Sequence, residues 1–130
     1  MFQSILMIDN VREFEVGPDP FGRMWQVHFR WHQTGTSIRH ADTVDVKFGV
    51  STGNEPSEER VIALPHPTLI AVSKKVGHPL TDAWCMKLAA LHLAHMFKSG
   101  EDFEKTLVTV QPAEMEHYAR ELQDALAANK

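Results

Sequence analysis

The sequence contains a single cysteine among its 130 residues, which excludes an internal disulfide. One cysteine gives no reason to place the chain in an oxidising compartment, where disulfides persist. The first nine residues carry no lysine or arginine and no long apolar run, so they do not resemble a secretory signal. These observations predict a cytoplasmic protein.

Glycine is also scarce, and no glycine-rich loop joins a predicted strand to a predicted helix. This absence argues against a dinucleotide fingerprint and against a P-loop. The patterns G-x-S-x-G, H-E-x-x-H and C-x-x-C are missing as well. The sequence therefore lacks the short motifs by which many enzymes are recognised, and it predicts no cofactor.

Positive charge is not in excess, because the formal net charge is −4. An acidic chain of this kind has no overall attraction to nucleic acids or to acidic membranes, and neither is predicted as a partner. Binding of nucleic acid would require one face to collect the basic residues Arg12, Arg23, Arg30, Arg39 and Lys47. Eight histidines would raise the charge from −4 to +4 if all were protonated, so the surface charge should respond to mild acid.

What the sequence does contain is enough apolar residues, 43% of the chain, for one domain over residues 1–130. The clearest strand lies at 24–33, where apolar and polar residues alternate. One face is predicted to hold Trp25, Val27, Phe29 and Trp31, and the other Gln26, His28, Arg30 and His32. Further strands are expected at 4–8, 11–16, 44–50, 60–64 and 106–110.

Gly49 falls inside the predicted strand 44–50, which indicates a bulge or a close approach of another group to the backbone. Helices are predicted at 67–76, at 81–100 and from Pro112 onward. The order of strands, two helices, a strand and a helix is typical of the α+β class. We expect an antiparallel meander of about four to five strands in the N-terminal half. About three helices from the C-terminal half should cover one face of it.

The helix over 81–100 is the predicted centre of the core. Thr81 is a suitable N-cap, and Gly100 follows the last turn. The helix is apolar nearly all round, apart from a thin solvent stripe marked by two lysines. The residues expected along this stripe are Lys87, Ala90, Leu91, Ala94 and Lys98. So much apolar surface predicts a sheet on one side and other helices or a second subunit on another.

Two histidines on this helix, His92 and His95, form the first candidate site. Residues three apart on a helix are neighbours, so two ring nitrogens could be presented to a metal ion. The alternative is structural, since histidines at the edge of a buried helix commonly fill gaps in the core and bond to nearby groups. Cys85 lies seven residues before His92, about 10 Å along the helix axis, so the helix alone cannot pair them. We expect Cys85 to be buried and inert.

The polar face of the strand at 24–33 is the second candidate. Arg30 between His28 and His32 could bind an anion such as a phosphate or a carboxylate. The alternative is an ordinary solvated sheet face. A third group, Arg39 to Asp45, could serve acid–base chemistry or only shape a bend. Together these segments give the candidate ligand-binding residues His28, Arg30, His32 and Arg39.

The leading functional hypothesis is a cytoplasmic, non-catalytic domain that associates with itself or with another protein. It depends on the nearly all-round apolar helix and on the absence of a motif-bearing loop. The alternative is a small enzyme, or a protein binding a small molecule or metal, with a histidine-lined pocket. Such a pocket would be centred on His92 and His95 or on the polar strand face. No residue is assigned a catalytic role.

Overall fold

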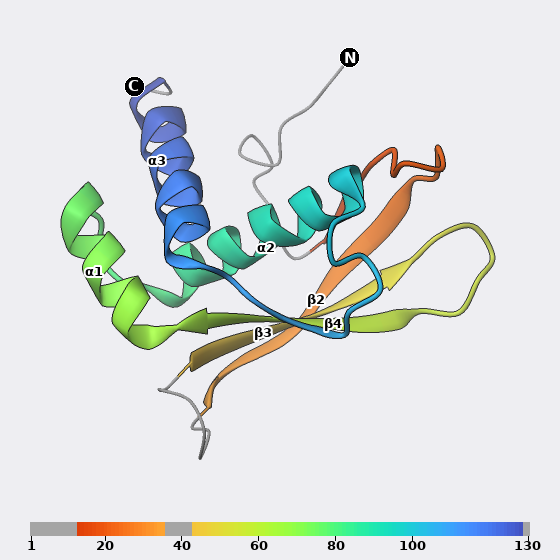
Figure 1. Ribbon diagram of the computed structural model, residues 1–130, viewed down its shortest axis with the longest axis horizontal. Coiled ribbons are helices and arrows are strands. Elements are labelled where there is room, and N and C mark those ends of the chain that lie inside the picture. The colour runs from red at the N-terminus through yellow and green to blue at the C-terminus, as the bar shows by residue number, and fades with distance from the viewer. Residues whose placement is uncertain (1–12, 36–42, 129–130) are drawn as a thin grey trace.

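The computed structural model describes residues 13–35 and 43–128, and it places a five-stranded sheet beneath three helices (Figure 1). This confirms the predicted α+β class. The predicted strand at 4–8 and the residues 36–42 lie outside the described residues. The elements are β1 (Glu13–Val16), β2 (Trp25–Gly35), β3 (Thr43–Ser51), β4 (Glu58–Pro65), α1 (His66–Val76), α2 (Asp82–Ser99), β5 (Leu107–Thr109) and α3 (Pro112–Ala128).

The strands follow one another across the sheet in the order β1-β2-β3-β4-β5. The first four are antiparallel neighbours, as a meander requires. The last strand, β5, instead runs parallel to β4. A parallel neighbour needs a long crossover, and here the crossover contains α1 and α2. The helices are thereby carried over one face of the sheet before β5 is added.

The predicted alternation in β2 holds as far as Phe29 and is interrupted there. Phe29 stands opposite Phe48, but Trp31 stands opposite Lys47, so the register of β2 on β3 shifts at Arg30. Such a shift is the mark of a β-bulge, in which one strand contributes an extra residue. The regular two-residue pattern predicted through Trp31 is therefore wrong beyond the bulge.

The central helix α2 is held at both ends by the expected caps. The Thr81 hydroxyl accepts a hydrogen bond from the backbone N–H of Trp84, at 3.1 Å. Gly100 adopts a left-handed conformation, with φ 79°, and its N–H donates to the carbonyl of Met96. A side chain at Gly100 would also meet Pro20, since an added Cβ would lie 2.9 Å from the Pro20 Cγ. This position therefore requires glycine for two reasons.

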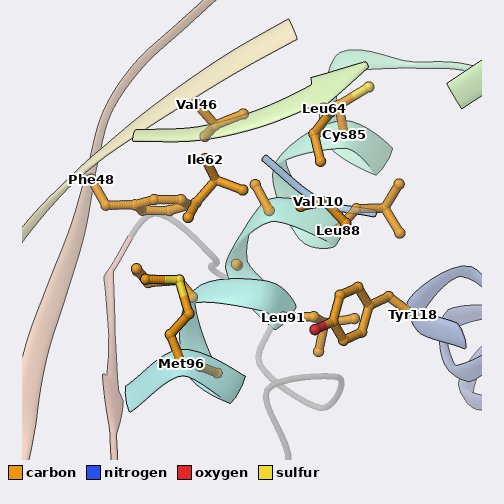
Figure 2. Close-up of a cluster of buried hydrophobic side chains, with 14 of the residues drawn as sticks. Val46, Phe48, Ile62, Leu64, Cys85, Leu88, Leu91, Met96, Val110 and Tyr118 are labelled. Atoms are coloured by element: carbon orange, nitrogen blue, oxygen red, sulfur yellow. The ribbon is translucent and has the colours of Figure 1, made fainter. Parts of the chain in front are cut away.

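Burial of α2 is more complete than expected, because twelve of its eighteen residues are buried. Ala90, Leu91 and Ala94 belong to this buried set, so the predicted solvent stripe is wrong at these three positions. Figure 2 shows side chains of β3 and β4 on one side of α2 and Tyr118 of α3 beside Leu91. Sheet and helices of one chain thus cover α2, and its apolar surface needs no second subunit.

The turn before β2 is built around Asp19. The Asp19 carboxylate accepts hydrogen bonds of 2.9 Å from the indole N–H of Trp25 and from the backbone N–H groups of Phe21 and Arg23. The Arg23 guanidinium also donates to it. Burial alone would raise the pKa of Asp19, but these bonds to the charged form lower that pKa from 3.8 to about 2.

Within the described residues, none of the helices has the length and apolar character needed to cross a membrane.

Candidate functional site

The outer face of the sheet is the side away from the three helices (Figure 1). Side chains alternate between the two faces along each strand, so the residues of the outer face lie between residues whose side chains point into the core. Most of them are polar and at least partly exposed. The outer face includes Glu13 and Glu15 of β1, Gln26, His28 and Arg30 of β2, Asp45, Lys47 and Gly49 of β3, Glu59, Val61 and Ala63 of β4, and Leu107 and Thr109 of β5.

Two of the predicted ligand-binding residues, His28 and Arg30, converge above Gly49 on this face. A Cβ added to Gly49 would lie 2.3 Å from Nε2 of His28 and 2.8 Å from Nε of Arg30. The two nitrogens therefore lie within about 5 Å of each other. The sequence-based expectation of a close approach to Gly49 is confirmed, and the approaching groups are the two side chains already suspected of binding an anion.

The acidic residues nearest to this pair are only partly available to it. Glu59, which stands opposite Gly49, makes an ion pair with Lys47 at 3.3 Å. Glu13 stands opposite His28 on the edge strand. Within the residues that the structure describes, no side-chain hydrogen bond or ion pair engages His28 or Arg30. Of the other two predicted residues, Arg39 and the side chain of His32 lie outside the described part of the chain.

The other predicted site, on α2, contains a buried histidine joined to a tyrosine. His92 is 2% exposed, and its Nδ1 shares a hydrogen bond of 2.8 Å with the hydroxyl of Tyr118 in α3. Its other ring nitrogen, Nε2, is buried and has no hydrogen-bond partner among the described residues. Burial lowers the pKa of His92, an effect that the charges of Glu114 and other nearby acids oppose. Burial disfavours the charged form of Tyr118 as well, and therefore raises the pKa of its hydroxyl.

His95 lies beside His92, as their spacing predicted, with 6.2 Å between the ring centroids. It differs in being exposed, and its Nε2 lies 3.5 Å from a carboxylate oxygen of Glu101. No cluster of three or more histidine, cysteine or acidic side chains among the described residues is placed to hold a metal ion. Metal binding by His92 and His95 therefore remains a prediction.

Sequence reasoning did not identify the partners of these histidines. Tyr118 belongs to the apolar stripe of α3, and nothing in that spacing indicates a bond to α2. Glu101 follows the helix stop at Gly100, where the local sequence indicates only a charged turn. Their roles depend on how α3 and the turn after α2 pack, which the periodicity of one segment does not reveal.

Cys85 is buried, as predicted, and its environment disfavours the thiolate. Burial raises the pKa of its thiol to about 11, and the charge of Asp82 adds to the effect. A thiol with such a pKa is a poor nucleophile near neutral pH. Cys85 is therefore a core residue and not a candidate for covalent chemistry.

A groove of about 380 Å³ lies between α1 and α3, and none of the predicted site residues lines it. It is lined mainly by small apolar residues, among them Pro67, Ala71, Pro112 and Ala113. An ion pair of 2.9 Å between Lys75 and Glu116 crosses it. No histidine lines this groove, so it is not the pocket that the alternative hypothesis predicted.

The fold and these two sites define an α+β protein with an open, polar sheet face and a buried histidine–tyrosine pair. Comparisons of the chain with protein-family models, with curated proteins and with solved structures found no match.

Proposed function

We propose that this chain is a non-catalytic, cytoplasmic domain that associates with a second copy of itself through the outer face of its sheet. The observation that carries the proposal is the one-sided cover of the sheet. The described helices all lie on the inner side of the sheet (Figure 1), and the described part of the outer face presents long charged side chains and one large exposed apolar side chain, Leu107. Since α2 is covered within one chain, the outer face is the surface that we assign to association.

The charges of the outer face favour a second copy as the partner. A two-fold interface uses the same surface twice, so that surface must be complementary to itself. Acidic Glu13 and Glu15 lie on β1, basic Arg30 and Lys47 lie on β2 and β3, and acidic Glu59 lies on β4. Rows of opposite sign in one face allow the acidic row of one copy to meet the basic row of the other. Complementary charge of this kind fixes orientation more than it adds affinity.

An apolar contact at one side of the outer face would supply the binding energy. Leu107 on the edge strand β5 is 59% exposed, and it stands beside Val61 of β4. Interfaces between proteins commonly combine an apolar centre with a charged rim. Leu107 is therefore the residue whose change should weaken association most.

Sedimentation velocity over a wide range of protein concentrations tests this proposal. We expect the wild-type chain, of 14.7 kDa, to show a concentration-dependent dimer. Leu107→Asp should shift the equilibrium to the monomer, because a charge would be buried without a partner. Lys87→Glu, an exposed charge change on α2, is the matched control and should leave the dimer intact. A wild-type protein that remains monomeric throughout would overturn self-association and leave a different protein as the partner.

The alternative function, a ligand or metal site around His92, is favoured by one observation. Its Nε2 is buried and has no partner in the part of the chain that the structure describes, and an unsatisfied buried nitrogen is costly unless something binds it. Native mass spectrometry of tag-free protein tests it directly. Added mass that disappears in a His92→Gln and His95→Gln variant would support this function, whereas bare protein would count against it.

A further inference from the structure

We propose that His28 and Arg30 form a binding site for an oxyanion, a carboxylate or a phosphate, above Gly49 on the outer face. Both side chains come from one strand and reach over the same point of the neighbouring strand. Their nitrogens, within about 5 Å of each other, are close enough for one oxyanion to accept from both. The site belongs to a single chain, so it goes beyond the proposed self-association and does not depend on it. In a dimer, a free anion would compete with the acidic row of the second copy for Arg30.

Gly49 is the feature that allows this arrangement. Glycine is disfavoured inside a strand because it has no side chain to pack and loses more conformational freedom on folding. Gly49 nonetheless occupies the interior of β3 and has no positive φ that would demand glycine. The absence of a Cβ leaves room for the His28 ring, because an added Cβ would lie 2.3 Å from its Nε2. Gly49 thus leaves the space in which the two donor side chains lie over the sheet.

The surrounding charges leave the two donors free for an external anion. Lys47 is paired with Glu59, and the amide of Gln26 donates to Glu15, so these nearby acids already have partners. Arg30 always carries its charge, and its planar fork suits a carboxylate or phosphate. Glu13 stands opposite His28, and its charge should weaken anion binding.

Nuclear magnetic resonance titration with sodium acetate and, separately, with inorganic phosphate tests the site. The signals to follow are the ring Cε1–H of His28 and the side-chain Nε–H of Arg30. We expect saturable shifts at millimolar concentrations, against a sodium chloride titration at equal ionic strength. A response to phosphate alone identifies a phosphate-bearing ligand, and a response to acetate as well extends the site to carboxylates. Shifts that only grow linearly with both salts overturn the proposal.

Three variants sharpen the test. Arg30→Gln should weaken binding about tenfold, since one hydrogen bond to a charged group is lost. Glu13→Gln should strengthen it, while Lys87→Gln, a charge removed from α2, should leave it unchanged. Equal weakening by Arg30→Gln and Lys87→Gln would show only general charge attraction and overturn the site. Repeating the titration in Leu107→Asp protein separates the two proposals, because the oxyanion site should survive when the dimer does not.

Discussion

The two faces of the sheet are made by the same strands, yet they have opposite surroundings. On the inner face Val46, Phe48 and Ile62 are at most 1% exposed and pack against α2 (Figure 2). On the outer face Arg30, Glu59 and Leu107 remain exposed. Burial of apolar area is the main favourable term in folding, so the inner face should carry most of the stability. The outer face is then available for recognition, since changes there cost the fold little.

The largest effect is expected from Phe97, which is completely buried on the inner side and packs edge-on against Trp25, with ring centroids 4.9 Å apart. Phe97→Ala should lower the free energy of unfolding by about 3–5 kcal/mol, because it removes apolar contact and leaves a cavity. Urea unfolding measures the change. Lys87→Ala on the same helix is the control, with an expected change within about 0.5 kcal/mol. A small loss at Phe97 would contradict the assignment of stability to the inner face.

The buried bond between α2 and α3 should have the next largest effect. Tyr118→Phe keeps the aromatic ring but removes the hydroxyl that bonds to His92. Neither ring nitrogen of His92 would then have a hydrogen-bond partner among residues 13–35 and 43–128. We expect a loss of about 1–3 kcal/mol in the free energy of unfolding. Unchanged stability in thermal or urea unfolding would show that the hydrogen bond has no net value.

His92 should also make stability depend on pH. The folded protein lowers the pKa of His92 below 6.5, so the unfolded chain takes up a proton more readily. Stability should therefore be complete above about pH 6.5 and fall as the pH drops through the lowered value. His92→Gln should flatten this dependence, whereas His117→Gln, at an exposed position, is the comparison variant. Equal slopes in wild type and His92→Gln would refute the assignment. The ionisable groups facing His92 are Tyr118, His95, Glu101, Asp102 and Glu114.

Asp19 should act at a lower pH and in the same direction. Its pKa falls from 3.8 to about 2 on folding, so the unfolded chain again binds the proton more readily. The stability that the carboxylate contributes should be complete above about pH 4 and lost as the pH falls towards 2. The Asp19→Asn variant has no carboxylate at this position and cannot lose this contribution. The free energies of unfolding of the variant and the wild type should therefore converge in acid. A constant difference from pH 5 to 2 would argue against a role for the charge.

The smallest effect is expected from the outer face itself. Glu59→Gln removes the ion pair with Lys47. The Glu59 side chain in this pair is half exposed. Surface pairs of this kind contribute about 0.2–1 kcal/mol, and added salt should reduce the contribution further. A loss of several kcal/mol, measured on dilute protein, would mean that this face is covered in the folded chain and is not open for association.

The order of the elements could be predicted from the sequence because it depends on local signals. Alternation marked β2 as far as Phe29, the cap at Thr81 and the stop at Gly100 marked α2, and Pro112 marked the start of α3. Part of each candidate site could also be predicted from the sequence. The helical spacing of His92 and His95 made them neighbours, and Gly49 inside a strand indicated a close approach.

What only the tertiary structure decided are contacts between segments distant in sequence. The bulge after Phe29 depends on how β2 matches β3, and the parallel pairing of β5 depends on where the crossover returns the chain. The burial of Leu91 depends on the packing of α3, and so does the bond between His92 and Tyr118. Local periodicity reports which face of an element is apolar, but the element that covers that face is chosen by packing over the whole chain.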